Sequence, residues 1–235
     1  MLHHIMHLAA DSANKQFEIL DRISHNVANV NTTGYKAKRF EQYLRVDGAI
    51  DGVERRDIAQ GALMITRRDL DMGIEGDGYF MVTQPDGTVA YTRDGSMMKT
   101  HDGYLVTARG DLLGNGIQVP TNYKKLAVMP DGVVKVKVHE NEEFQIVGRI
   151  RLATFPNAEG LKAIGDNKLV PTHQSGQPQL MAHQSELRQG YLERSNVNLH
   201  HQIDQILRLN AGVLSNMRIA KFTDDIYRQA VNLRQ

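Results

Sequence analysis

The stretch that decides the fold covers residues 21–36 and reads Asp21-Arg-Ile-Ser-His-Asn26-Val-Ala28-Asn29-Val-Asn31-Thr32-Thr-Gly34-Tyr35-Lys36. Its first half continues a helical pattern that begins near residue 1. Its second half consists of residues that form helices poorly, followed by Gly34, which we expect to adopt a left-handed conformation as the helix cap. The stretch therefore predicts an N-terminal helix over residues 1–30 with a defined end.

One face of this predicted helix carries a heptad pattern, which is typical of a helix that packs along its length. The positions recur at alternating steps of four and three: Ile5, Ala9, Ser12, Gln16, Ile19, Ile23, Asn26 and Val30. A helix of about 28 residues is about 42 Å long, because each residue adds about 1.5 Å. Polar residues interrupt the apolar face, so the helix should be only marginally stable without a partner.

A second helix is predicted over residues 198–233. Its pattern again steps by three and four, with Leu207 and Leu214 widening the stripe and residues 195–198 supplying N-cap candidates: Ile203, Ile206, Asn210, Val213, Met217, Ala220, Asp224, Tyr227 and Val231. Both segments could be ordinary core-packing helices. Their length and their position at opposite ends of the chain instead favour pairing with each other or with other copies, so assembly is the first hypothesis.

The region between the helices predicts antiparallel strands. Asp-Gly, a strong hairpin signal, occurs at residues 51–52, 77–78, 86–87, 94–95, 102–103 and 131–132. Strands are expected at 78–83, 89–92, 103–107, 125–129, 133–138 and 145–155. The predicted fold is α+β: long N- and C-terminal helices that pair as a coiled coil, with a mainly antiparallel β domain inserted between them.

This pattern divides the chain into four parts. Residues 1–35 form the N-terminal helix of a core domain, 36–69 an extended linker, 70–190 a β-rich outer domain, and 191–235 the C-terminal helix of the core domain.

Composition excludes several classes of protein. The 235 residues include 28 basic and 27 acidic side chains, so no basic field points to nucleic acid as a partner. Cysteine is absent, which rules out disulfides and thiolate sites. No apolar run is long enough for a membrane helix, and the first residues do not form a secretory signal peptide, so we expect neither membrane insertion nor a cleaved signal.

No set of residues predicts catalysis, a cofactor or a metal. His3 and His7 share a helical face and His200 and His201 lie in the other helix, but no acidic or cysteine ligand accompanies them, which favours solvated histidines. Arg109-Gly110-Asp111 is read as a turn rather than an adhesion motif. The glycine-rich residues 73–78 lack both the GxGxxG pattern and a Walker lysine.

Residues of the opening stretch resemble the N-terminal signature of the bacterial flagellar rod and hook proteins. The matching positions are Asn26, Ala28, Asn29, Thr32, Gly34, Tyr35 and Lys36. Further resemblance lies, in the family's order, in residues 70–80, 91–96, 155–161, 165–167, 175–176 and 190–198. Together these stretches are distributed along most of the chain. His25 and the end of the C-terminal helix depart from the family pattern.

The resemblance implies a structural subunit of the flagellar basal-body rod, which spans the periplasm and joins motor to hook. It implies polymerisation through the terminal helices with copies of itself and neighbouring rod or hook proteins, and export by the flagellar type III apparatus. The short segment between Lys38 and Gln60 and the residues 66–80 favour the proximal rod member.

Two groups of residues follow as candidate sites. The predicted assembly interface comprises Ile5, Ile19, Ile23, Asn26, Asn29, Val30, Ile203, Ile206, Leu207, Asn210, Val213 and Met217. The predicted family-signature turn comprises Thr32, Gly34, Tyr35, Lys36, Ser195, Asn196 and Asn198. Two alternatives remain open at this point: a self-contained adaptor or adhesin-like module with a helical stalk, and an enzyme.

Overall fold

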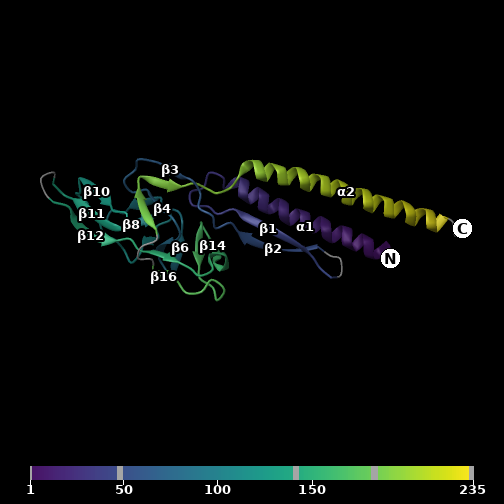
Figure 1. The fold of residues 1–235 in the computed structure, drawn as a ribbon, viewed down its shortest axis with the longest axis horizontal. Helices are drawn as coiled ribbons and strands as arrows, with labels where there is room; N and C mark the ends of the chain where they lie inside the picture. The colour runs from purple at the N-terminus through teal and green to yellow at the C-terminus, as the bar shows by residue number, and fades with distance from the viewer. Residues whose placement is uncertain (1, 47–49, 140–142, 181–184, 233–235) are drawn as a thin grey trace. The chain divides into compact units, whose positions relative to one another are not determined.

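The computed structural model describes residues 2–46, 50–139, 143–180 and 185–232, without the side chains of residues 2–9, 50, 227 and 230–232 (Figure 1). The chain divides into two compact units. The terminal unit contains residues 1–30, 37–57 and 197–235, and the β unit contains residues 31–36 and 58–196. The division into four parts expected from the sequence stays a prediction.

The terminal unit consists of two helices and one hairpin. Its elements are α1 (Leu2–Ala28), β1 (Lys38–Leu44), β2 (Ile50–Arg56) and α2 (Leu199–Asn232). The strands pair antiparallel, from Lys38 opposite Arg56 to Leu44 opposite Ile50. Within this unit α1 lies between α2 and the hairpin (Figure 1).

A buried asparagine ties α1 to the hairpin. Asn26 is 1% exposed, donates Nδ2–H to the Lys38 carbonyl at 2.8 Å and accepts the Lys38 N–H on Oδ1 at 2.8 Å. The Asn26 amide thus bonds both the N–H and the carbonyl of Lys38, the first residue of β1, as a neighbouring strand would. Beside it, Arg22 pairs with Glu54 at 2.9 Å and stacks over the Phe40 ring at 4.5 Å.

Small and polar residues form the contact between α1 and α2. Asn26 donates to Gln202 Oε1 at 3.2 Å, and Asn216 donates to Ser12 Oγ at 2.9 Å. Between these bonds Gly212 lies against Gln16, where an added Cβ would be 2.8 Å from the amide nitrogen. Gln202 and Thr223 are the buried residues of α2 in the described part of the chain.

The predicted coiled coil of long terminal helices is therefore wrong. Three of the apolar side chains assigned to the assembly interface on the C-terminal helix, Ile203, Leu207 and Met217, are 48%, 61% and 64% exposed. The face of α2 that meets α1 is rotated by about one residue, or about 100°. Small and polar side chains permit the close approach and supply the hydrogen bonds, so the more polar face of α2 turns inward. Ile206 and Val213 are half-buried beside it, and several other large apolar side chains of α2 stay outside.

The β unit is built from antiparallel strands. Its strands are β3 (Leu63–Ile65), β4 (Met72–Glu75), β5 (Tyr79–Thr83), β6 (Val89–Thr92), β7 (Met97–Lys99), β8 (Leu105–Thr107), β9 (Leu112–Leu113), β10 (Lys125–Val128), β11 (Val133–Lys137), β12 (Gln145–Arg149), β13 (Leu152–Thr154), β14 (Lys162–Gly165), β15 (Lys168–Val170), β16 (Gln179–Leu180), β17 (Glu186–Gln189) and β18 (Tyr191–Glu193). One 3₁₀ turn, η1 (Ala158–Gly160), follows β13.

The strands form one large sheet and three small ones. The large sheet has nine strands, in the order β14-β15-β6-β5-β9-β8-β7, with β13 pairing both β5 and β16. The small sheets are β10-β11-β12, β17-β4 and β18-β3. In the large sheet β5 is central, because one edge pairs with β6 and the other is shared by β13 and β9.

Alternation along β5 divides the core in two. Phe80 and Val82, both 0% exposed, face the larger cluster, which includes residues of β4, β10 and β11. Tyr79 faces the opposite side, where the Phe155 ring packs edge-on against Tyr79 and Tyr91 at 6.0 and 4.8 Å between ring centres. Successive side chains of a strand point to opposite faces, so one short strand organises both clusters.

The Asp-Gly hairpins predicted at residues 86–87, 102–103 and 131–132 are confirmed. They join β5 to β6, β7 to β8 and β10 to β11, and their glycines have φ of +85°, +89° and +87°. The expected Gly110-Asp111 turn joins β8 to β9, with φ of +88° at Gly110. Turn chemistry is local, which is why the sequence locates these hairpins.

Candidate functional site

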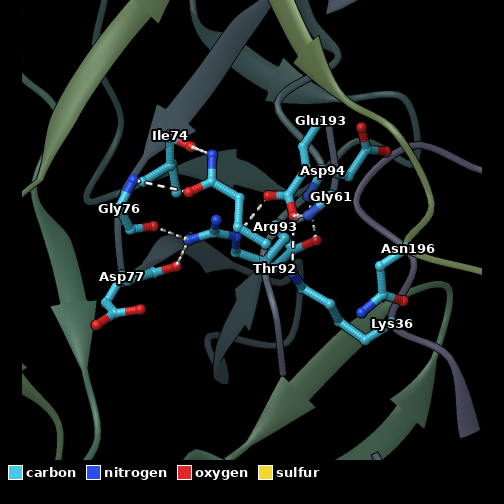
Figure 2. A network of polar contacts seen from close by, with 12 residues as sticks. Lys36, Gly61, Ile74, Gly76, Asp77, Thr92, Arg93, Asp94, Glu193 and Asn196 are labelled. Atoms are coloured by element: carbon cyan, nitrogen blue, oxygen red, sulfur yellow. Dashed lines mark hydrogen bonds and ion pairs between the residues drawn. The ribbon is translucent and has the colours of Figure 1, made fainter. Parts of the chain in front are cut away.

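A buried carboxylate holds together two cations in the β unit (Figure 2). Glu193, at the end of β18, is 1% exposed. Its Oε1 accepts from Lys36 Nζ at 2.7 Å and from the Gly61 N–H at 2.8 Å, and its Oε2 accepts from Arg93 Nε at 2.7 Å. Lys36 and Arg93 are each 5% exposed. We call these three side chains the ionic cluster.

The ionic cluster also binds backbone carbonyls. Arg93 Nη1 donates to the carbonyls of Gly76 and Gly78 at 3.0 and 2.6 Å, and Lys36 Nζ donates to the Ala59 carbonyl at 2.7 Å. Next to it, the Gln60 amide donates to the Ile74 carbonyl and accepts the Gly76 N–H, both at 2.9 Å. Buried charges are tolerated when they are paired and hydrogen-bonded in this way.

Three stretches that are distant in sequence meet at the ionic cluster. Lys36 comes from the segment where the chain enters the β unit, Arg93 follows β6, and Glu193 lies just before the chain leaves this unit. Backbone bonds reinforce the meeting: the Gly34 N–H donates to the Glu193 carbonyl at 2.8 Å and the Asn196 N–H to the Tyr35 carbonyl at 3.3 Å. The first and last segments of the β unit are thus fastened to each other.

A glycine is required at position 34 both by its backbone conformation and by the small space beside it. Its φ is +64°, and a Cβ at this position would lie 2.5 Å from the Arg93 carbonyl carbon and 2.6 Å from the Asp94 nitrogen. The glycine has the expected left-handed conformation, but α1 already ends at Ala28. Gly34 therefore serves the close packing of the entering segment on the Arg93 backbone, rather than acting as the cap of the helix.

A half-buried aspartate lies beside this turn. Asp94 Oδ1 accepts from Thr33 Oγ1 at 2.7 Å and from the Ser96 N–H at 3.1 Å. Burial raises the pKa of Asp94 and the charge of Asp71 adds to the rise, against the opposite effect of the two hydrogen bonds. Asp71 is itself 1% exposed, and neither of its carboxylate oxygens has a hydrogen bond in the described part of the chain.

A second buried ion pair removes the aspartate of the Arg109–Asp111 triplet from solvent. Asp111 is 2% exposed, and its Oδ2 lies 3.1 Å from Lys168 Nζ. An adhesion tripeptide must present its aspartate to a partner. The Arg109–Asp111 triplet instead uses this aspartate to fasten the turn to β15, which gives no support to an adhesin-like function.

The candidate assembly residues of α1 lie mostly on its inner face. Ile23 and Asn26 are buried, and Ile19, Asn29 and Val30 are half-buried. The side chain of Ile5 lies outside the described residues. On α2, Ile206 and Val213 are half-buried, whereas Ile203, Leu207, Asn210 and Met217 are exposed.

The candidate signature residues gather around the ionic cluster or at the start of α2. Gly34, Tyr35 and Lys36 are buried, and Thr32, Ser195 and Asn196 are half-buried. The exposed Asn198 caps α2, since its Oδ1 accepts the His201 N–H at 3.2 Å. Arg93 and Glu193 lie in the resembling stretches 91–96 and 190–198 but are not among the predicted site residues. A charged residue at the end of an otherwise apolar strand was the signal available for each.

The described residues contain no group of three or more histidines, cysteines or acidic residues that could hold a metal ion. His200 and His201 are exposed, and the side chains of His3, His4 and His7 lie outside the description. Neither helix, over its described residues, has a segment long and apolar enough to cross a membrane.

We predict that Glu193→Gln lowers the free energy of unfolding of the β unit by about 3–5 kcal/mol, because it leaves two buried cations without a carboxylate. Urea unfolding followed by circular dichroism measures the loss. The matched control is Asp166→Asn, which removes an exposed pair with Arg109 at 2.8 Å and should change stability by at most about 1 kcal/mol. Equal effects of the two substitutions would contradict a structural role for the ionic cluster.

We predict that Gly34→Ala destabilises the protein more than Gly87→Ala. Both glycines have positive φ, so each substitution carries a conformational penalty of about 1–2 kcal/mol. Gly87 has open space around its Cβ position, whereas Gly34 faces the Arg93 backbone, which must move. Thermal unfolding of both variants tests this. Equal shifts in the melting temperature would show that the close packing at Gly34 has no energetic weight.

We predict that the stability of Asp94→Asn relative to the wild type increases as pH rises. A raised pKa in the folded state means that wild-type stability is lost as pH rises through that pKa, and asparagine keeps the acceptor oxygen without the charge. The stability of the variant minus that of the wild type should therefore increase from pH 3 to pH 7. Asp86→Asn is the control with opposite sign, because the Thr88 N–H lowers the pKa of Asp86. A stability difference between Asp94→Asn and the wild type that does not change with pH would contradict the raised pKa of Asp94.

Comparison with known proteins gives consistent matches. A family model described as the flagellar hook protein FlgE/F/G D1 domain matches residues 73–136, from β4 to β11. The chain is 32% identical to the flagellar basal-body rod protein FlgG of Buchnera aphidicola subsp. Baizongia pistaciae, over 88% of this chain and 90% of that protein.

Two further relatives extend the similarity. FlgG of Bacillus subtilis is 32% identical over 95% of this chain and 97% of its own length. The flagellar basal-body rod protein FlgF of Rhizobium meliloti is 31% identical over 81% of this chain and 80% of its own length. With the converging signature segments and the inserted antiparallel β unit, these matches over nearly full length place the chain in the flagellar basal-body rod protein family.

Proposed function

We propose that this protein is a structural subunit of the flagellar basal-body rod, which assembles with copies of itself and with neighbouring rod and hook proteins. Family membership supports the rod and the basal body as its location. The observation that carries the mode of assembly is an apolar surface on α2 that has no partner among the described residues.

This surface, which we call the α2 stripe, consists of five side chains on one helical face, 45% to 64% exposed: Leu199, Ile203, Leu207, Leu214 and Met217. Their spacings of four, four, seven and three residues keep them on one side of a helix. A contiguous exposed apolar surface on a folded protein is typical of an interaction site.

The α2 stripe is distinct from the face of α2 that meets α1. That inner face uses Gln202, Gly212 and Asn216 for contacts within the chain. Burying the half-exposed stripe residues against a neighbouring subunit would contribute roughly 1 kcal/mol per side chain. Many weak, equivalent contacts of this kind suit a polymer, in which each subunit has several neighbours.

Two further parts of the proposal rest on the family alone. We infer that the protein is not an enzyme, because the relatives are named as rod proteins. We also infer export through the flagellar type III apparatus without a cleaved signal.

The sequence features above favour the proximal rod position, while the extensive matches to FlgG, the distal-rod protein, favour the distal one.

A charge on the α2 stripe should block assembly and leave the subunit folded. We predict that Leu207→Asp reduces polymerisation of the purified protein at least tenfold and abolishes motility when the variant replaces the wild type. Sedimentation of polymer and swimming assays measure these effects. Far-UV circular dichroism should remain that of the wild type, because Leu207 is already 61% exposed in the subunit.

The matched control is Ser215→Asp, which places the same charge at an exposed position of α2 on a different face. It should assemble normally. If Leu207→Asp polymerised as well as the wild type, the α2 stripe would not be part of the interface between subunits. Normal flagella in cells that lack the gene would contradict the rod function itself.

A further inference from the structure

A half-open cavity of about 280 Å³ lies beside the ionic cluster, within the β unit. Lys36 and Arg93 contribute its charged part, and Ile58, Phe155, Pro156 and Ala158 contribute apolar walls. The contacts described above hold the ionic cluster together. We next consider which group could bind Arg93 from the side of the cavity.

One end of the Arg93 guanidinium has unused donors. Nε binds Glu193, and Nη1 binds the carbonyls of Gly76 and Gly78. Nη2 donates no hydrogen bond to any described residue. It is also not fully buried. Two N–H groups of a fixed, nearly buried cation are therefore available to an acceptor that enters the cavity.

The charges favour an anion as this acceptor. Two buried cations, Lys36 and Arg93, share the single carboxylate of Glu193, so the ionic cluster carries one net positive charge. Asp77 also lines the cavity, but its carboxylate is exposed and turns away from the guanidinium (Figure 2). An arginine held in place by three bonds is well suited to bind a carboxylate through its remaining donors.

The size of the cavity favours a side chain over a free ligand. Small-molecule sites typically measure about 300–1,000 Å³ and enclose most of the ligand. The cavity lies just below this range and is half-open. Its apolar walls favour an acidic side chain with more methylene groups beside its charged end, which matches glutamate better than aspartate.

We propose that this cavity, the Arg93 pocket, receives the carboxylate of a glutamate side chain from a neighbouring rod subunit. The glutamate binds Arg93 Nη2, and its methylene groups lie against Phe155, Pro156 and Ala158. The proposal rests on the proposed function, because the neighbour is another subunit of the rod. It adds a polar, directional contact on the β unit to the apolar contact of the α2 stripe.

The first test measures the chemistry on the full-length monomer, independently of assembly. The probe is N-acetyl-glutamate N-methylamide, added to protein labelled with ¹⁵N-arginine and observed by NMR. The Arg93 side-chain signals should shift in a saturable way, with an affinity at least tenfold higher than for N-acetyl-glutamine N-methylamide. Equal shifts with both compounds, or none, would overturn the Arg93 pocket as a carboxylate site.

The second test asks whether assembly uses the pocket. Ala158→Trp fills the cavity without altering the ionic cluster, and the control Ile164→Trp adds the same ring at an exposed position of β14 outside the cavity. The pocket-filling variant should lose the probe-induced shift and polymerise at least fivefold more weakly than the control. Unchanged polymerisation would overturn the proposal while leaving the rod function intact.

The outcomes separate the two proposals. If wild-type protein binds the glutamate probe but never polymerises, the proposed function fails and the carboxylate chemistry stands. If Ala158→Trp does not fold, the NMR titration of the wild type still decides whether the pocket binds carboxylate. If the wild type polymerises and no probe binds, the rod function stands and the Arg93 pocket is rejected.

Discussion

The pairing of one buried carboxylate with two cations is the constraint on which the β unit depends. A charge as deeply buried as that of Glu193 is tolerable only if partners compensate for the lost hydration. Lys36 and Arg93 supply this compensation from positions 157 and 100 residues away in sequence. The entering segment, the turn after β6 and the leaving segment must therefore be in place at the same time. This requirement makes the two ends of the β unit one structural element.

The terminal unit follows a different principle. Its helices approach through Gly212 and through polar pairs such as Asn26 with Gln202, which fix position and register. The apolar residues of the α2 stripe are left for other contacts. A subunit of a polymer benefits from this division, because the inner face can define the subunit while the α2 stripe remains available to neighbours. The proposed glutamate contact at the Arg93 pocket would add direction to such an assembly.

Local chemistry explains which elements were predictable. The Asp-Gly turns at residues 86–87, 102–103 and 131–132 were found from sequence because positive φ and flanking alternation are properties of a few adjacent residues. The inner face of α1 was also predictable, since Ile23 and Asn26 repeat with the helical period. The inner face of α2 was assigned incorrectly, because hydrophobic periodicity was used to find the buried side and there the apolar side is the exposed one.

The sequence by itself determined the family signature, the two helices, the strands β5, β6, β8, β10 and β11, and the need for a left-handed residue at Gly34. Each of these follows from the conformational preferences of short segments. Only the tertiary structure decided that Lys36, Arg93 and Glu193 share one buried site, that Asp111 of the Arg-Gly-Asp triplet is paired with Lys168, and which face of α2 is free. These features depend on which distant residues can satisfy a buried charge or allow close approach, and no local pattern encodes the partner.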